Sequence, residues 1–178
     1  MVYLESIMAL HEQYMTEALK EAEAALANGE FPVGCVMVAG GRIVCRGHRK
    51  NSCEVGENEI DHAEILTLRS LLAETPDFNC STLTVYSTME PCLMCYSAML
   101  LSGIRTLVWG YEDVMGGGTN LPLAQLNPLY AEMEVKVIDS ILRQQSLHLF
   151  QKFFRAYPYL QKSLLSQYTL AQSLEKIR

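Results

Sequence analysis

The sequence has no apolar stretch long enough to cross a membrane. Its longest run without a charged residue, residues 114–131, is interrupted by three glycines and two prolines. The amino-terminal segment carries no basic cluster ahead of an apolar core, and Glu5 and Glu12 lie where such a core would be. This pattern argues against a signal peptide. We therefore expect a soluble cytoplasmic protein without a membrane partner.

Positive charge is also scarce. The 14 Lys and Arg against 20 Asp and Glu leave a net charge of -6, which does not favour a polyanionic partner for the chain as a whole. The segment from residue 131 onward is the exception, with seven basic against four acidic residues, so a local contact with a polyanion stays open. No internal repeat or low-complexity segment is present. The 178 residues are predicted to form one domain, 1–178, in which 158–178 is a C-terminal helical extension.

The six cysteines, at positions 35, 45, 53, 80, 92 and 95, lack the regular spacing of a disulfide framework. Only Cys92 and Cys95 have a spacing typical of metal ligands. Cys35 and Cys45 lie in apolar, strand-like segments, so we expect both to be buried, reduced thiols.

Hydrophobic periodicity predicts helices alternating with strands. Apolar residues at three- and four-residue steps indicate helices, and β-rich runs between turn residues indicate strands. Gly40-Gly41 predicts a hairpin, Asp61 is expected to cap a helix, and Pro91 to open one. This order predicts an α/β protein with one mixed sheet and helices on both faces. The expected helices are 6–27, 61–74, 91–101 and two after 138, broken near Pro158; the expected strands are 33–39, 42–47, 82–87, 104–109 and 134–138.

Two short motifs carry residues suited to chemistry, His62-Ala63-Glu64 and Pro91-Cys92-Leu93-Met94-Cys95. Because Cys92 and Cys95 are three residues apart, a helix places both thiols on one face, where they can bind one metal ion. His62 would make three protein ligands, and zinc with three ligands holds a water whose pKa falls to about 7. Glu64, beside the metal but not bound to it, could carry a proton from that water to a substrate.

Each motif has a plainer interpretation when it is taken alone. Asp61 and Glu64 match a capping box, so Glu64 could be only a helix cap. A Cys-x-x-Cys pair is commonly a redox centre or half of a structural zinc site, but a redox protein would leave His62 and Glu64 without a role. Together, the motifs lie 30 positions apart with a predicted strand between them. This pairing is the signature of zinc-dependent nucleobase deaminases, so it favours a catalytic metal site.

From about residue 30 to 155 the sequence resembles the cytidine deaminase-like superfamily, and within it the bacterial tRNA adenosine deaminases. The similarity covers Glu30-Phe31-Pro32-Val33-Gly34, both zinc motifs, Gly110 and Asp113 with the glycines that follow, and Phe153-Phe154-Arg155. It implies a three-layer α/β/α sandwich with a five-stranded sheet whose last two strands are parallel, usually in a homodimer. It also implies one Zn²⁺ per chain, bound by His62, Cys92 and Cys95, with Glu64 as the catalytic proton carrier. The substrate contacts that it implies are Asn51, Ala63, Pro32, Glu90, Asp113 and Phe154.

The substrate implied by the resemblance is adenosine in a tRNA anticodon loop, but the sequence departs from the family pattern. The family usually has Gly-x-Asn after its second strand, whereas here the run Gly47-His48-Arg49-Lys50-Asn51 is two residues longer, which makes Asn51 the expected counterpart. Glu112 and Met115 replace basic residues, which removes charge that could pair with phosphate. A free base or nucleoside, such as guanine or cytosine, is therefore the second hypothesis. A non-catalytic, zinc-bearing partner subunit is the third, although such a subunit would not need Glu64.

Overall fold

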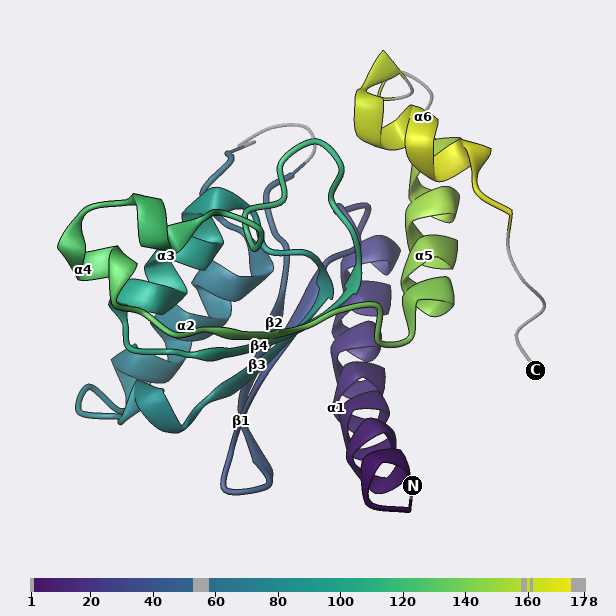
Figure 1. Ribbon diagram of the computed structural model, residues 1–178. Helices are drawn as coiled ribbons and strands as arrows, with labels where there is room; N and C mark the ends of the chain where they lie inside the picture. Colours follow the sequence, from purple (N-terminus) through teal and green to yellow (C-terminus); the bar gives the residue numbers. More distant parts are fainter. Residues whose placement is uncertain (1, 53–57, 158–159, 161, 174–178) are drawn as a thin grey trace.

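A mixed five-stranded sheet lies between two layers of helices (Figure 1) in the computed structural model, which describes the chain except residues 1, 53–57, 158–159, 161 and 174–178. The strand order is β2-β1-β3-β4-β5. β1 is antiparallel to β2 and β3, whereas β3, β4 and β5 run parallel to one another. The predicted mixed sheet, with its last two strands parallel, is confirmed. The strands are β1 (Gly34–Ala39), β2 (Arg42–His48), β3 (Thr84–Met89), β4 (Thr106–Tyr111) and β5 (Lys136–Ile138).

Helices cover both faces of this sheet. α1 and α5 pack on one face, and α2 and α3 on the other. The apolar cluster beneath α2 and α3 also includes α5 residues such as Phe150 and Phe153, and a second cluster lies beneath α1. No helix among the described residues is long and apolar enough to span a bilayer. Cys35 is a buried free thiol, as predicted, and Cys45 is a half-buried one. The helices are α1 (Val2–Ala27), α2 (Ala63–Glu74), α3 (Leu93–Leu101), α4 (Pro128–Ala131), α5 (Arg143–Ala156) and α6 (Leu164–Ala171).

The starts of α2 and α3 differ from the prediction. His62, not Asp61, is the N-cap of α2, and no side chain caps that helix. The Asp61 carboxylate instead accepts hydrogen bonds from the side-chain amides of Asn51 and Asn58, at 2.6 and 2.9 Å. Cys92 is the N-cap of α3, so Pro91 precedes the helix rather than opening it. The metal-ligand candidates therefore stand at the helix ends themselves.

The other differences are small shifts of the element bounds, and α1 starts four residues earlier than predicted, at Val2. β3 starts at Thr84, two residues later than predicted, because Cys80–Thr82 form a 3₁₀ turn in which the Asn79 side chain accepts a hydrogen bond from the Ser81 amide. β4 and β5 likewise start two residues late. The predicted break near Pro158 lies outside the described residues.

α1 packs closely against β1 because Gly34 has no side chain. A Cβ added there would lie 2.1 Å from the Ala18 carbonyl oxygen and 2.5 Å from the Ala22 amide nitrogen. Both alanines are fully buried, and their small size permits the same approach from the helix side. The backbone atoms cannot move aside without separating the helix from the sheet.

We expect Gly34→Ala to lower the free energy of unfolding by more than about 3 kcal/mol. The added methyl group would overlap backbone atoms, which cannot move away without separating α1 from β1. Gly40→Ala is the matched control. Gly40 has open space around it and a φ of +56°, so alanine there adds only backbone strain of about 1–2 kcal/mol. Urea unfolding of the zinc-loaded proteins measures both values. An equal or larger loss in Gly40→Ala would contradict this account of the packing.

Candidate metal centre

Three potential ligands meet where two helices begin at one edge of the sheet. His62 precedes the first residue of α2, and Cys92 precedes the first residue of α3, which follows β3 directly. Cys95 lies in the first turn of α3. The positive end of each helix dipole points at the cluster, an environment that favours thiolates over thiols. The ligands predicted from the sequence thus come together as a cluster of one nitrogen and two sulfur atoms.

The geometry of the cluster fits a tetrahedral metal ion. The Nδ1 atom of His62 lies 3.4 Å from the Cys92 Sγ atom and 3.5 Å from the Cys95 Sγ atom. The three ligand atoms all lie within 4.8 Å of one another. Typical Zn–N and Zn–S bonds of about 2.0–2.3 Å predict a nitrogen–sulfur separation of about 3.6 Å around one zinc ion. One histidine and two cysteines are also a donor set found in catalytic zinc sites.

The two thiols differ in acidity. Hydrogen bonds from Cys95 and His62, opposed by burial, lower the pKa of Cys92 to about 4. The pKa of Cys95 is raised because its thiol is held in the hydrogen bond to Cys92 and is buried. The lowered pKa favours the thiolate form of Cys92, which is the form that binds zinc.

Glu64 stands next to this cluster, and it is not a helix cap. Its side chain is buried, and its Oε1 atom accepts a 2.6 Å hydrogen bond from the hydroxyl of Ser87 on β3. The capping-box interpretation requires the carboxylate to turn back to the start of the helix, so this bond excludes it. Ser87 was not among the site residues predicted from the sequence; its signal was a polar residue between Val85 and Met89, on the inward face of a buried strand.

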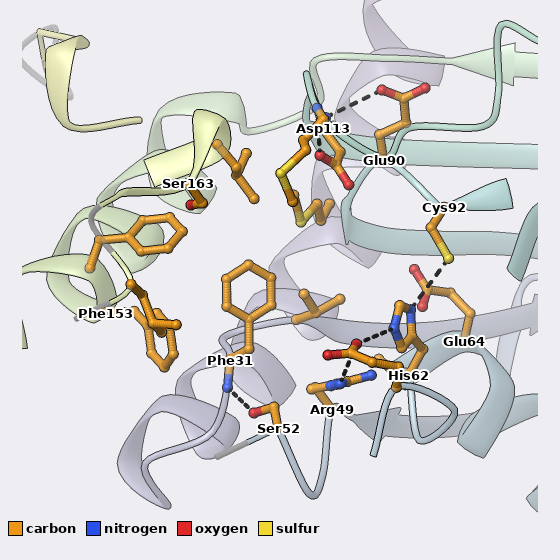
Figure 2. A pocket seen from close by; sticks show the side chains of 18 residues that line it. Phe31, Arg49, Ser52, His62, Glu64, Glu90, Cys92, Asp113, Phe153 and Ser163 are labelled. Atoms are coloured by element: carbon orange, nitrogen blue, oxygen red, sulfur yellow. Dashed lines mark hydrogen bonds and ion pairs between the residues drawn. The ribbon is translucent and has the colours of Figure 1, made fainter. Parts of the chain in front are cut away.

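A cavity of about 310 Å³ opens beside the cluster. Figure 2 shows its two sides, with Phe31 and Phe153 facing His62, Glu64 and Cys92 across the space. Such a volume is at the lower end of small-molecule sites, and an apolar wall with a few polar groups is typical of them. The lining includes four predicted site residues besides His62, Cys92 and Glu64, namely Ala63, Glu90, Asp113 and Phe154.

The loop after β4 is tied to the cavity by Glu90. The Oε1 atom of Glu90 accepts a hydrogen bond of 2.6 Å from the Thr119 hydroxyl, and its Oε2 atom accepts one of 3.3 Å from the Asp113 amide. Asp113 in turn accepts hydrogen bonds from the amides of Met115 and Gly116 through Oδ1. A Cβ on Gly117 would lie 2.4 Å from the Glu90 carboxylate and 2.7 Å from the backbone oxygen of Asp113, so glycine is required where the loop passes them. Glu90 thus holds the loop that carries Asp113.

α5 and the C-terminal residues form the aromatic side of the cavity. The Phe31 ring makes an edge contact with Phe153 at 5.2 Å and another with Phe154 at 6.0 Å between ring centroids. Leu160, Ser163 and Leu165 extend this wall, so the C-terminal extension forms part of the site.

A polar cluster fixes α6 in this position. Glu112 accepts a paired hydrogen bond from the Arg143 guanidinium and a 2.7 Å bond from the Tyr168 hydroxyl on α6. Burial raises the pKa of Glu112, but these hydrogen bonds outweigh it and leave the pKa below its usual value. The carboxylate of Glu112 therefore serves to hold Arg143 and Tyr168 together.

Two predicted substrate contacts lie outside the cavity lining. Pro32 is buried between the lining residues Phe31 and Val33, and Asn51 bonds to Asp61 at the surface. β2 ends at His48, and the next residue, Arg49, lines the cavity with 5% of its surface exposed. Arg49, two residues after Gly47, thus lies in the cavity, whereas Asn51 does not line it.

The fold and this site define a zinc-dependent deaminase of the cytidine deaminase-like class. Residues 8–111 match the cytidine and deoxycytidylate deaminase zinc-binding region. The chain belongs to this family, whose members hydrolyse C–N bonds of nucleobases or nucleosides with the help of zinc.

Among its relatives are enzymes named tRNA-specific adenosine deaminase. The protein from Bacillus subtilis is 33% identical over 148 residues, which span 83% of this chain and 91% of the relative. One from Streptococcus pyogenes is 34% identical over 149 residues, or 83% and 92% of the two chains. A solved structure from a study of A-to-I editing by tRNA:A34 deaminases at the wobble position aligns with a TM-score of 0.63 and 26% identity, over 77% of this chain and 99% of that one. The guanine deaminase of Nitrosomonas europaea shares the fold, with a TM-score of 0.64 and 22% identity over 80% of this chain and 83% of its own.

We expect His62→Ala and Cys92→Ser each to weaken zinc binding by roughly a hundred-fold or more, because even residues outside the ligand set account for 10–100-fold effects. Cys45→Ser is the control, since this thiol donates to the Thr67 carbonyl away from the cluster. Zinc content after dialysis against a competing chelator measures the difference. Full zinc retention in Cys92→Ser would refute the assignment of this ligand.

Proposed function

We propose that this deaminase converts adenosine to inosine in the anticodon loop of tRNA. The observation that carries the proposal is the similarity to tRNA-specific adenosine deaminases, which spans 83% of this chain and 91% of the Bacillus subtilis relative. The cavity supports it, because a volume of about 310 Å³ with an aromatic wall suits one base extruded from a loop. An unpaired loop base costs little to extrude.

The roles proposed for the residues follow from their positions. His62, Cys92 and Cys95 would hold the zinc ion, which supplies a water of lowered pKa when bound. Glu64 accepts a proton from the attacking water and passes it to the ring nitrogen next to the amino group. It then takes the remaining hydroxyl proton and gives it to the departing amine, so that ammonia leaves and a carbonyl group remains. The protons and the oxygen of one water account for the whole change.

The cavity walls would position the base for this transfer. Phe31, Phe153 and Phe154 offer ring faces or edges to a base, and aromatic contacts of this kind contribute about 1–3 kcal/mol per base. Asp113 and Ala63 line the space beside Glu64 and are proposed to contact the substrate, while Glu90 acts through the loop that it holds. Pro32 is proposed to support the cavity floor. Asn51 is proposed to contact the substrate from outside the cavity.

We expect zinc-loaded protein to form inosine at the wobble position of an anticodon stem–loop RNA, as measured by mass spectrometry. Glu64→Gln should retain zinc and lose at least about a hundred-fold in kcat, the usual contribution of general acid–base catalysis. A near wild-type rate in this variant would refute the proposed role of Glu64.

The KM for RNA should rise steeply with salt, because phosphate contacts release counterions. If the loaded protein forms no inosine but releases ammonia from guanine or cytosine with little salt dependence, a free base is the substrate.

We also propose that residues 1–178 act as one cytoplasmic domain that forms a homodimer. Leu93 and Leu101 on α3 and Leu129 on α4 are large apolar side chains that are more than half exposed. Burying them against a second copy would remove this surface from water. Light scattering should give twice the chain mass of 20.0 kDa. A monomer at micromolar concentration would contradict the proposal.

A further inference from the structure

Ser87 places a hydroxyl group inside an apolar layer. It lies on β3 with 1% of its surface exposed, and its neighbours on the same strand face, Val85 and Met89, belong to the core cluster beneath α2 and α3. A buried hydroxyl needs a hydrogen-bond partner, and without one its burial is unfavourable. The role of the Ser87 hydroxyl therefore follows from the group to which it donates.

That partner is the carboxylate of Glu64. The Ser87 hydroxyl donates to the Oε1 atom at 2.6 Å, and only 3% of the Glu64 surface is exposed. Hydrogen bonds to an ionised acceptor are short and about twice as strong as neutral ones, and this length is in their range. Figure 2 shows the Glu64 carboxylate beside His62 and Cys92, so the bond holds a group that faces the metal-ligand candidates.

The bond also distinguishes the two oxygens of the carboxylate. The terminal torsion of glutamate is broad, so either oxygen of an unrestrained side chain could take the proton. While Ser87 donates to Oε1, a proton on Oε2 leaves this hydrogen bond intact, whereas a proton on Oε1 would require the Ser87 hydroxyl to turn and accept it. The bond therefore favours Oε2 as the oxygen that takes the proton.

We propose that Ser87 is a positioning residue which engages Oε1 of Glu64 and so leaves Oε2 as the oxygen that carries the proton. This inference rests on the proposed role of Glu64 as the proton carrier, and it holds whichever nucleobase is the substrate. Each turnover moves two protons through Glu64, so a carboxylate with one competent oxygen needs no rotation between the two transfers.

Thr88 separates this role from a purely structural one. It is the next residue on β3 and is fully buried, but it points to the opposite face, where its Oγ1 atom accepts a 3.0 Å hydrogen bond from the Gly34 amide. Replacing either hydroxyl removes one buried hydrogen bond from the same strand. Only the Ser87 bond ends on Glu64.

The experiment compares Ser87→Thr with Ser87→Val, which have the same shape and differ by one hydroxyl, together with Ser87→Ala and Thr88→Val. Inosine formation in the anticodon stem–loop RNA gives kcat and KM, and zinc content and unfolding midpoint are measured for each protein. We expect Ser87→Val and Ser87→Ala to lower kcat roughly ten- to a hundred-fold, the range for a hydrogen bond to a charged group, with KM and zinc content unchanged. Ser87→Thr should restore most of kcat, and Thr88→Val should lose stability while keeping kcat.

Two results would overturn the proposal: a kcat within two-fold of wild type in Ser87→Val, or an equal fall of kcat in Thr88→Val. If wild-type protein does not act on the RNA, the proposed substrate is wrong. The kcat of each variant relative to wild type is then measured with guanine as the substrate. A crystal structure of the zinc-loaded protein provides a test that needs no turnover. A Glu64 carboxylate there without a hydrogen bond from Ser87 would refute the positioning role by itself.

Discussion

The approach of two helix N-termini at one edge of the sheet governs the chemistry of this protein. α2 and α3 begin so close together that the imidazole of His62 lies within 3.5 Å of both the Cys92 and Cys95 sulfur atoms. The aligned peptide dipoles of both helices stabilise negative charge there, which offsets the cost of gathering thiolates in a partly buried place. A bound metal ion would offset the remaining free-energy cost, because its ligand atoms already lie close together.

The sheet and the helices that cover it position the residues around this cluster. β3 delivers Ser87 to one side of Glu64 and continues into Glu90, which holds the loop after β4. On the opposite side, Phe31 precedes β1 and packs against the aromatic residues of α5. Glu112, at the end of β4, fixes α6 through Arg143 and Tyr168 and so completes the wall. The cavity is thus lined by residues from strand ends, from the start of α2, from the loop after β4, from α5 and from the C-terminal residues, rather than from strand interiors.

Much of the fold could be predicted because its signals are local. The periodicity of α1, the Gly40-Gly41 turn and the alternation of strands with helices each depend on residues that are neighbours in the sequence. The boundaries were less predictable because side chains from elsewhere compete for the same groups. Asp61 has the chemistry of a cap, yet Asn51 and Asn58 engage its carboxylate, and His62 takes the capping position.

The sequence by itself determined the donor set, because the spacing of Cys92 and Cys95 on a helix, and of His62 and Glu64 in one turn, fixes which side chains can converge. The tertiary structure alone decided what surrounds those donors. The pairing of β3 in the sheet placed Ser87 against Glu64, the end of β2 put Arg49 rather than Asn51 in the cavity, and the docking of α6 closed one wall. These contacts join residues far apart in the chain. Their geometry depends on strand register and helix packing, which no local pattern of residues encodes.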